Sequence, residues 1–243
     1  MRLSLLLFKS LTSLLFVCLF ALSAFAGDFA QRHIIGFSED GKRFAFEQYG
    51  IQDGSGFPYS EIFIIDTASD TWVSGSPFKV RLEDEAQSVS AARNAALAKA
   101  GNALNGITQP GTIIATNRAT ELTGDTRRMV ALPRIAAPPI DEPVEFRIEN
   151  IALPGKELCN QFGQSNGFRL TRIDASDGGK TRILHQDSKI PNSRNCPLDY
   201  HLADIITYYP NNSGPVAAVL ILMKTVGFEG PDGRYLAVTT KLD

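Results

Sequence analysis

The stretch VAAVLILM, residues 216–223, is apolar at all eight positions. A strand with one face in water alternates apolar and polar residues, whereas an unbroken apolar run of this length, bounded by turn residues, is typical of a fully buried strand. The sequence therefore predicts a strand at this position with both of its faces covered.

Most of the remaining chain reads as short strands separated by turn residues. The apolar run at 61–65 is followed by a turn at 66–70 and by a second short run at 71–73, and this pattern predicts a hairpin. Further strands are expected at residues 34–37, 43–47, 144–151, 168–173, 181–185, 201–208 and 235–239. The predicted fold class is mainly β, built of antiparallel sheets.

One amphipathic helix is expected to interrupt the strands, at about residues 83–104. The acidic run at 83–85 suits a first helical turn, because carboxylates complement the helix dipole. Small or apolar residues follow at helical spacing, at Val89, Ala92, Ala96, Ala100 and Leu104. An alanine-rich stripe favours close packing against a sheet, and a partner-binding helix is the alternative.

Prolines at 133, 138, 139 and 143 mark a stiff connector. The connector is either a boundary between two small β lobes or a crossing within one fold. A single mostly β domain over residues 27–243 is favoured, because the Asp-Gly turn at 40–41 is echoed at 232–233. That echo suggests that the first and last strands lie near each other.

The first 26 residues have the three parts of a secretory signal peptide. Arg2 and Lys9 supply the basic start, residues 11–26 carry no charge, and the segment ends in Ala-Phe-Ala before Gly27. Cleavage is therefore expected between Ala26 and Gly27. The uncharged run is shorter than the roughly 20 residues of a membrane-spanning helix, so an uncleaved anchor is the less favoured alternative.

The predicted mature chain is mildly acidic. Removal of Arg2 and Lys9 leaves 22 basic against 26 acidic residues, a net charge of −4. This balance argues against nucleic acid as a partner, because phosphate binding needs a basic surface. No other stretch is long and apolar enough to span a membrane, so no stable span is expected after cleavage.

Two cysteines remain after cleavage, Cys159 and Cys196. In an oxidising compartment they form one possible disulfide, closing a loop of about 38 residues worth roughly 4 kcal/mol in the chain-entropy description. The alternative is two unpaired thiols. A redox-active pair is disfavoured, because the spacing does not resemble Cys-x-x-Cys.

Residues 163–167, GQSNG, match the G-x-S-x-G nucleophile elbow and make Ser165 a candidate nucleophile. The elbow works between a buried strand and a helix. Here no buried strand precedes the motif, and the residues that follow alternate like a strand. Asp187 or Asp199 with His201 would supply the chain order of a triad. A turn between strands explains the glycines more simply, so Ser165 belongs to an alternative, serine hydrolase hypothesis.

No metal site or cofactor is expected. His33, His185 and His201 are scattered, without the tight spacing that zinc ligands usually show. Aspartates at predicted turns invite a calcium interpretation, but they form no Asp-x-Asp-x-Asp-Gly series and hairpin turns favour the same residues. These aspartates are Asp40, Asp66, Asp70, Asp174, Asp177 and Asp232.

Aromatic residues offer candidates for a ligand groove. Phe57 and Tyr59, in a glycine-rich loop, are favoured over Trp72 and the pair at 208–209, while core packing is the plainer interpretation of all of them.

Two internal echoes suggest a resemblance. Residues 36–46 echo 227–238, and residues 63–70 echo 171–178; the shared phrases are an Asp-Gly turn before a strand and a strand that ends in an Asp turn. They resemble blades of the TolB-type β-propeller, clearly over 37–73 and partly beyond. A propeller needs four or more blades of about 40 residues, so a complete propeller is not expected.

The mature chain also resembles, over most of its length, an uncharacterised bacterial family of predicted secreted proteins. The likeness lies in residues 36–41, in the pair Cys159 and Cys196, and in residues 227–232. It implies export to the periplasm or the medium and carries no activity.

Three functions follow as hypotheses. The first is a non-catalytic exported module that binds a protein or an envelope component, by analogy with the recognition loops of propeller repeats. The second is a serine hydrolase that uses Ser165, and the third is a structural envelope protein.

Overall fold

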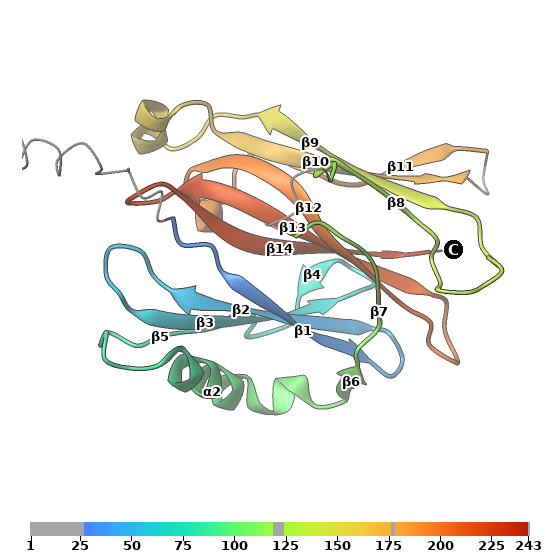
Figure 1. Ribbon diagram of the computed structural model, residues 1–243, viewed down its shortest axis with the longest axis horizontal. Coiled ribbons are helices and arrows are strands. Elements are labelled where there is room, and N and C mark those ends of the chain that lie inside the picture. The colour runs from blue at the N-terminus through green and yellow to red at the C-terminus, as the bar shows by residue number, and fades with distance from the viewer. Residues whose placement is uncertain (1–26, 119–123, 176–177, 243) are drawn as a thin grey trace, which may run out of the picture.

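The computed structural model describes residues 27–118, 124–175 and 178–242 (Figure 1). The predicted signal peptide, Ala26 included, and Asp177 lie outside these ranges. Three antiparallel sheets are stacked on one another, and helix α2 (Val89–Ala100) covers the outer face of the first sheet. Within these residues, the expected mainly β fold of antiparallel sheets with one α-helix is confirmed.

The first sheet has the order β4-β3-β2-β1-β6, with β5 also paired to β3. The central sheet has the order β14-β13-β12-β7, and the third sheet has the order β11-β10-β9-β8. The strands of the first sheet are β1 (Gln31–Ser38), β2 (Arg43–Ile51), β3 (Pro58–Asp66), β4 (Thr71–Trp72), β5 (Phe78–Arg81) and β6 (Ile107–Gln109). Those of the central sheet are β7 (Thr112–Thr116), β12 (Pro197–Tyr208), β13 (Val216–Val226) and β14 (Pro231–Lys241). Those of the third are β8 (Arg128–Ala131), β9 (Val144–Ala152), β10 (Asn166–Asp174) and β11 (Lys180–Gln186). The chain also contains the 3-10 turns η1 (Gly101–Leu104), η2 (Glu157–Phe162) and η4 (Asn192–Arg194).

Strand β13 lies inside the central sheet and is covered on both faces, as its apolar sequence predicts. Val216, Ala218 and Leu220 pack with the first sheet around Phe44 and Phe46. The alternate residues of β13, Val219, Ile221 and Met223, pack with the third sheet around Phe146 and Phe168. Two cores therefore meet at one strand, because successive side chains of a strand point to opposite faces.

Helix α2 presents its predicted stripe to the first sheet but is shorter than expected. Ala92, Ala96 and Ala100 are buried against a small core that contains Ile62 and Ile64. The expected start at residue 83 is wrong. Ser88 is the N-cap and its side chain accepts a hydrogen bond from the Ala91 amide, while Asp84 accepts one from the Ala86 amide within a preceding turn. Beyond Ala100 the chain tightens into η1.

The predicted strands and the hairpin at 61–73 are present, with Ile65 paired to Trp72. The strands β5 to β8 escaped prediction. They are short, and β6, β7 and β8 each stand at the end of their sheets. Their main pairing partners lie elsewhere in the sequence, so no strong local pattern marks them.

The proline-rich connector joins β8 to β9, and these two strands pair with each other in the third sheet. Within the part of the chain that the structure describes, the sheets form neither a closed barrel nor a propeller, as expected. The likeness of 37–73 to a propeller blade stays a resemblance.

Candidate ligand-binding cleft

A cleft of about 550 Å³ runs along β14, between the first and third sheets. The central sheet ends at β14, so the two outer sheets form the walls and the edge strand forms the floor. The floor includes Tyr235, Ala237 and Val238. A cleft of this size falls in the range of small-molecule sites, which are typically about 300–1,000 Å³.

The free edge of β14 is hydrogen-bonded along its length by groups from outside its own sheet. The Tyr235 amide donates to Gln48 Oε1 at 2.7 Å, and the Thr239 amide donates to Asp70 Oδ1 at 2.7 Å. The Gly233 amide donates to the Asp28 carbonyl at 2.9 Å. These contacts protect an edge that would otherwise attract another strand.

The wall from the first sheet is aromatic. Phe46 and Phe63 stack with their ring centroids 4.8 Å apart, and Trp72 tilts against Phe63 at 5.9 Å. Phe46 and Phe63 are buried, whereas Trp72 is 50% exposed and lines the cleft. An indole packed against Phe63, which in turn stacks on Phe46, offers a fixed apolar surface to a ligand.

The wall from the third sheet carries a buried charged group. Asp187 accepts from His185 Nε2 at 2.9 Å, from Arg194 Nη1 at 2.5 Å and from the Phe168 amide at 2.9 Å. Burial alone would raise the pKa of Asp187, but these hydrogen bonds and the guanidinium charge outweigh burial and lower it. His185 stacks on Phe168, with centroids 4.5 Å apart, so the imidazole is held in place.

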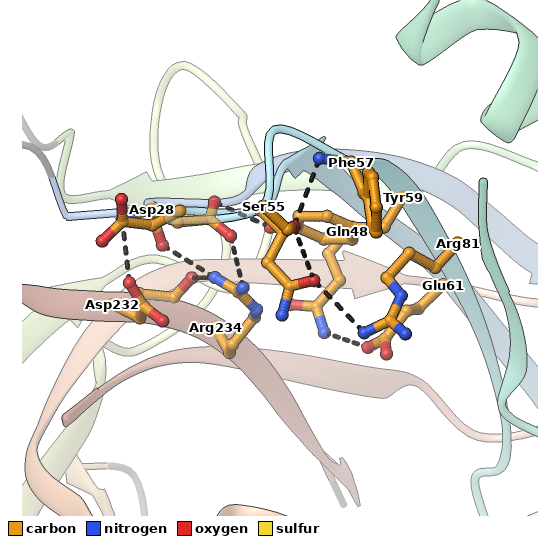
Figure 2. A network of polar contacts seen from close by, with 12 residues as sticks. Asp28, Gln48, Ser55, Phe57, Tyr59, Glu61, Arg81, Asp232 and Arg234 are labelled. Atoms are coloured by element: carbon orange, nitrogen blue, oxygen red, sulfur yellow. Dashed lines mark hydrogen bonds and ion pairs between the residues drawn. The ribbon is translucent and has the colours of Figure 1, made fainter. Parts of the chain in front are cut away.

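A polar network stands at one end of the cleft, where the first described residues meet β3 and β14 (Figure 2). Arg234 pairs with the Asp28 carboxylate and also donates to the Asp28 carbonyl at 2.7 Å. Tyr59 donates its hydroxyl hydrogen to Asp28 at 3.0 Å, and burial raises the pKa of that hydroxyl. The Asp28 amide donates to Asp232 at 2.9 Å.

The same end holds a second set of contacts on the first sheet (Figure 2). Gln48 Nε2 donates to Glu61 at 2.7 Å, and Lys79 pairs with the other oxygen of Glu61 at 2.7 Å. Arg81 donates to Gln52 at 3.2 Å. The cleft thus presents amide and charged groups that are already paired with one another.

Ser165 lies away from this cleft. It is 4% exposed, just before β10, and the turn η2 precedes it, so the order is turn, loop and strand rather than strand, turn and helix. Of the residues that the structure describes, the hollow that Ser165 lines contains Gly155, Asn160 and Gln164 and no histidine or carboxylate. Of the triad partners named with it, Asp199 contacts His201 at 2.9 Å, whereas Asp187 contacts His185 instead. The two histidines line other hollows, apart from Ser165.

Cys159 and Cys196 stand at disulfide distance, with the sulfur atoms 1.99 Å and the Cα atoms 5.3 Å apart. Both side chains are buried, and they connect η2 to the start of β12. The geometry fits the predicted pair.

Among the predicted turn aspartates, Asp40 and Asp66 accept hydrogen bonds within their own turns, whereas Asp70 and Asp232 contact distant parts of the chain. Asp40 accepts from Ser38 and from the Lys42 amide, and these hydrogen bonds lower its pKa to about 2. Asp66 accepts from the amides of the turn that follows it. Among residues 27–118, 124–175 and 178–242, no group of three or more potential metal ligands comes together, and no helix is long and apolar enough to cross a membrane.

Sequence patterns did not identify the cleft. Of the aromatic candidates, Trp72 lines it, while Tyr59 is buried beside Asp28 and Phe57 contacts Arg81. His185 lines the cleft as part of a wall that sequence spacing does not reveal. Its partner Asp187 lies two residues further on, just after the end of β11. The close spacing of these two residues was the signal that the sequence offered.

Three stacked antiparallel sheets, with a cleft of about 550 Å³ at the open edge of the middle one, define a mainly β protein. A protein-family model described as "Predicted secreted protein (DUF2259)" matches residues 45–241. The chain belongs to this family. No curated protein matches the chain. The family description confirms the expected location outside the cytoplasm, and the paired cysteines are consistent with it.

Proposed function

We propose that this exported protein is a non-catalytic binding module that takes a protein or envelope component into the cleft along β14. The observation that carries the proposal is the half-exposed indole of Trp72 on a wall of buried aromatic rings, facing a wall of paired polar groups. Concave sites with an apolar surface and a few oriented polar groups are the usual form of ligand sites.

Binding is favoured over hydrolysis by the surroundings of the hydroxyl groups. A catalytic serine needs a base within hydrogen-bonding reach and a group that orients the base. In the described part of the chain, the hollow of Ser165 is lined by no histidine or carboxylate. Ser193 lines the cleft together with His185, but no hydrogen bond joins these two side chains in the described structure.

Trp72 makes the proposal directly testable, because it is the single tryptophan of the chain. Its emission reports on the cleft without a label. The purified mature protein is titrated with soluble peptidoglycan fragments, a polysaccharide fraction and a periplasmic protein fraction. A binding fraction is expected to shift the emission to shorter wavelength and to reduce quenching by acrylamide.

Two variants calibrate the titration. Trp72→Phe removes the tryptophan emission, so the binding of this variant is measured by calorimetry. Its affinity for a fraction that shifted the emission of the wild type should be lower than that of the wild type. Ile113→Ala is the matched control, because Ile113 is also 50% exposed but lies on β7, at the opposite edge of the central sheet. If all fractions leave Trp72 unchanged, or both variants bind equally, the cleft is not the binding site and a structural role gains support.

The hydrolase alternative has its own test. A fluorophosphonate probe is expected to leave the mature protein unlabelled. Labelling that disappears in Ser165→Ala would establish the alternative, and labelling that disappears in Ser193→Ala would place a nucleophile in the cleft instead.

A further inference from the structure

The first residues of the predicted mature chain are built into the central sheet. Phe29 forms a parallel bridge with Gly233 of β14, and the Ala30 amide donates to the Gly233 carbonyl at 3.0 Å. Together with the bond from the Gly233 amide to Asp28, these contacts add a short segment to the free edge of β14. The segment begins one residue after the predicted cleavage bond.

Gly27 occupies a place that admits no side chain. A Cβ atom on Gly27 would lie 2.1 Å from the Pro231 carbonyl oxygen, a backbone atom that cannot move aside like the end of a flexible side chain. The backbone of Gly27 is therefore held close to the turn before β14. A chain that began with a larger residue at this position would not fit the same path.

Acidic side chains gather around this segment. Asp28 and Asp53 both act on Asp232 as like charges, and Arg234 acts on it as the opposite charge. Arg234 pairs with Asp28, Asp53 accepts from the Glu229 amide at 2.9 Å, and the facing group from β3 is the neutral hydroxyl of Tyr59. Among the described groups that act on Asp232, the two like charges of Asp28 and Asp53 therefore stand against the single opposite charge of Arg234.

The acidic group nearest to the chain start is Asp232. The Asp28 amide nitrogen lies 2.9 Å from Asp232 Oδ1. The Gly27 nitrogen precedes that amide by one residue, at most about 3.6 Å away, and is therefore within about 6.5 Å of the same oxygen. Burial, with Asp28 and Asp53 nearby, raises the pKa of Asp232, so its carboxylate lacks sufficient compensation in the uncleaved chain.

We propose that these residues form a binding site for the α-ammonium group that cleavage creates on Gly27, with Asp232 as its counter-ion. Hydrolysis adds one water across the Ala26–Gly27 peptide bond, leaving a carboxylate on Ala26 and, after protonation by the same water, an ammonium on Gly27. Before cleavage the Gly27 nitrogen is a neutral amide. Processing therefore supplies the missing positive charge and fastens the mature chain start to β14.

The test measures the pKa of the Gly27 amine in protein secreted and processed by the cell, by the pH dependence of the Gly27 NMR signals. An α-amino group ordinarily has a pKa of about 7.7–8.0, and the proposal expects a rise of at least about one unit, a tenfold change in the protonation equilibrium. Asp232→Asn should abolish the rise. Asp141→Asn, on the proline-rich connector and paired with Arg134, is the control that should leave it intact.

A second measurement keeps the proposal falsifiable if Asp232→Asn does not fold. Selective acetylation of the wild-type α-amine should lower Tm at pH 7. Pairing raises the pKa of the amine in the folded protein. The amine's contribution to stability is therefore complete below about pH 8 and is lost as pH rises through that raised pKa, so the Tm values of the acetylated and the unmodified protein should converge near pH 10. An unshifted amine, a shift that survives Asp232→Asn, parallel Tm curves, or a mature chain that begins elsewhere than Gly27 would each overturn it.

Discussion

Replacing Arg194 by Met tests how the third-sheet wall of the cleft is held. The guanidinium is 11% exposed and pairs with Asp187, which is 5% exposed; it also lies over the rings of Phe168 and Tyr200. Breaking a buried pair by removing one partner costs about 3–5 kcal/mol, because the remaining charge stays buried without its counter-ion. Asp187 keeps its bonds from His185 and the Phe168 amide, so we expect the low end of that range, about 3 kcal/mol.

Urea unfolding followed by circular dichroism measures this cost at pH 7, with the cysteine pair kept oxidised. A loss of about 3 kcal/mol in a domain of this size corresponds to a fall in Tm of about 6–12 °C. Arg169→Met is the matched control, because Arg169 lies on β10 and forms a 3.4 Å pair with Glu149 in which both side chains are exposed. Exposed pairs contribute about 0–1 kcal/mol, so the control should change little.

The pH dependence of the stability difference between wild type and Arg194→Met is a second test. The pKa of Asp187 is lower in the folded protein than in the unfolded chain, so its contribution is complete above about pH 5 and is lost as pH falls through the folded value. Loss of Arg194 raises the folded pKa. The stability difference between wild type and Arg194→Met should therefore shrink below about pH 4, as Asp187 becomes neutral. A cost no larger than that of Arg169→Met, or one independent of pH, would refute this account.

Three further outcomes are expected. Intact-mass analysis of exported protein should show the loss of residues 1–26 and a mass two hydrogens below the reduced form, and full-length, reduced protein would contradict cleavage and disulfide formation. The double variant Cys159→Ala/Cys196→Ala should lose about 4 kcal/mol of unfolding free energy in urea. Ala96→Leu should cost about 1–3 kcal/mol by overpacking the contact of α2 with the first sheet, whereas Ala98→Leu, on the exposed face, should be close to neutral. Asp70→Ala should uncover the Thr239 amide on the edge of β14 and promote self-association, and light scattering that finds an unchanged monomer would count against edge protection.

Prediction from sequence succeeded where the signal is local. The run 216–223 has no polar position, and that alone requires two covered faces, which the two cores on β13 provide. The alanine stripe of α2 likewise needs no partner to be visible. The helix start was misplaced because carboxylates favour turns as well as first helical turns, and Asp84 caps a turn of its own while Ser88 caps the helix.

The cleft escaped prediction because its parts come from three sheets. Trp72, Arg194 and Tyr235 are far apart in the sequence, and they meet only after the sheets stack. No spacing rule connects them. The favoured aromatic candidates were chosen because they were expected in a loop. Tyr59 instead lies near the start of β3 and donates its hydroxyl hydrogen to Asp28, a residue that no sequence pattern relates to it.

The same stacking decides how a ligand in the cleft would be recognised. An extended peptide that added to β14 as a strand would need the amides of Tyr235 and Thr239, and both already donate to oxygens of the first sheet. Gln48 is also buried and holds Glu61, so releasing its oxygen would disturb a second contact. A strand would therefore replace existing hydrogen bonds rather than add new ones, and the exchange would gain little free energy. Contacts with side chains, above all with the exposed indole of Trp72, carry no such cost, because the indole surface is already presented to solvent. Recognition through the walls of the cleft is thus favoured over strand addition along its floor, and for that reason Trp72 is the residue at which binding should first be sought.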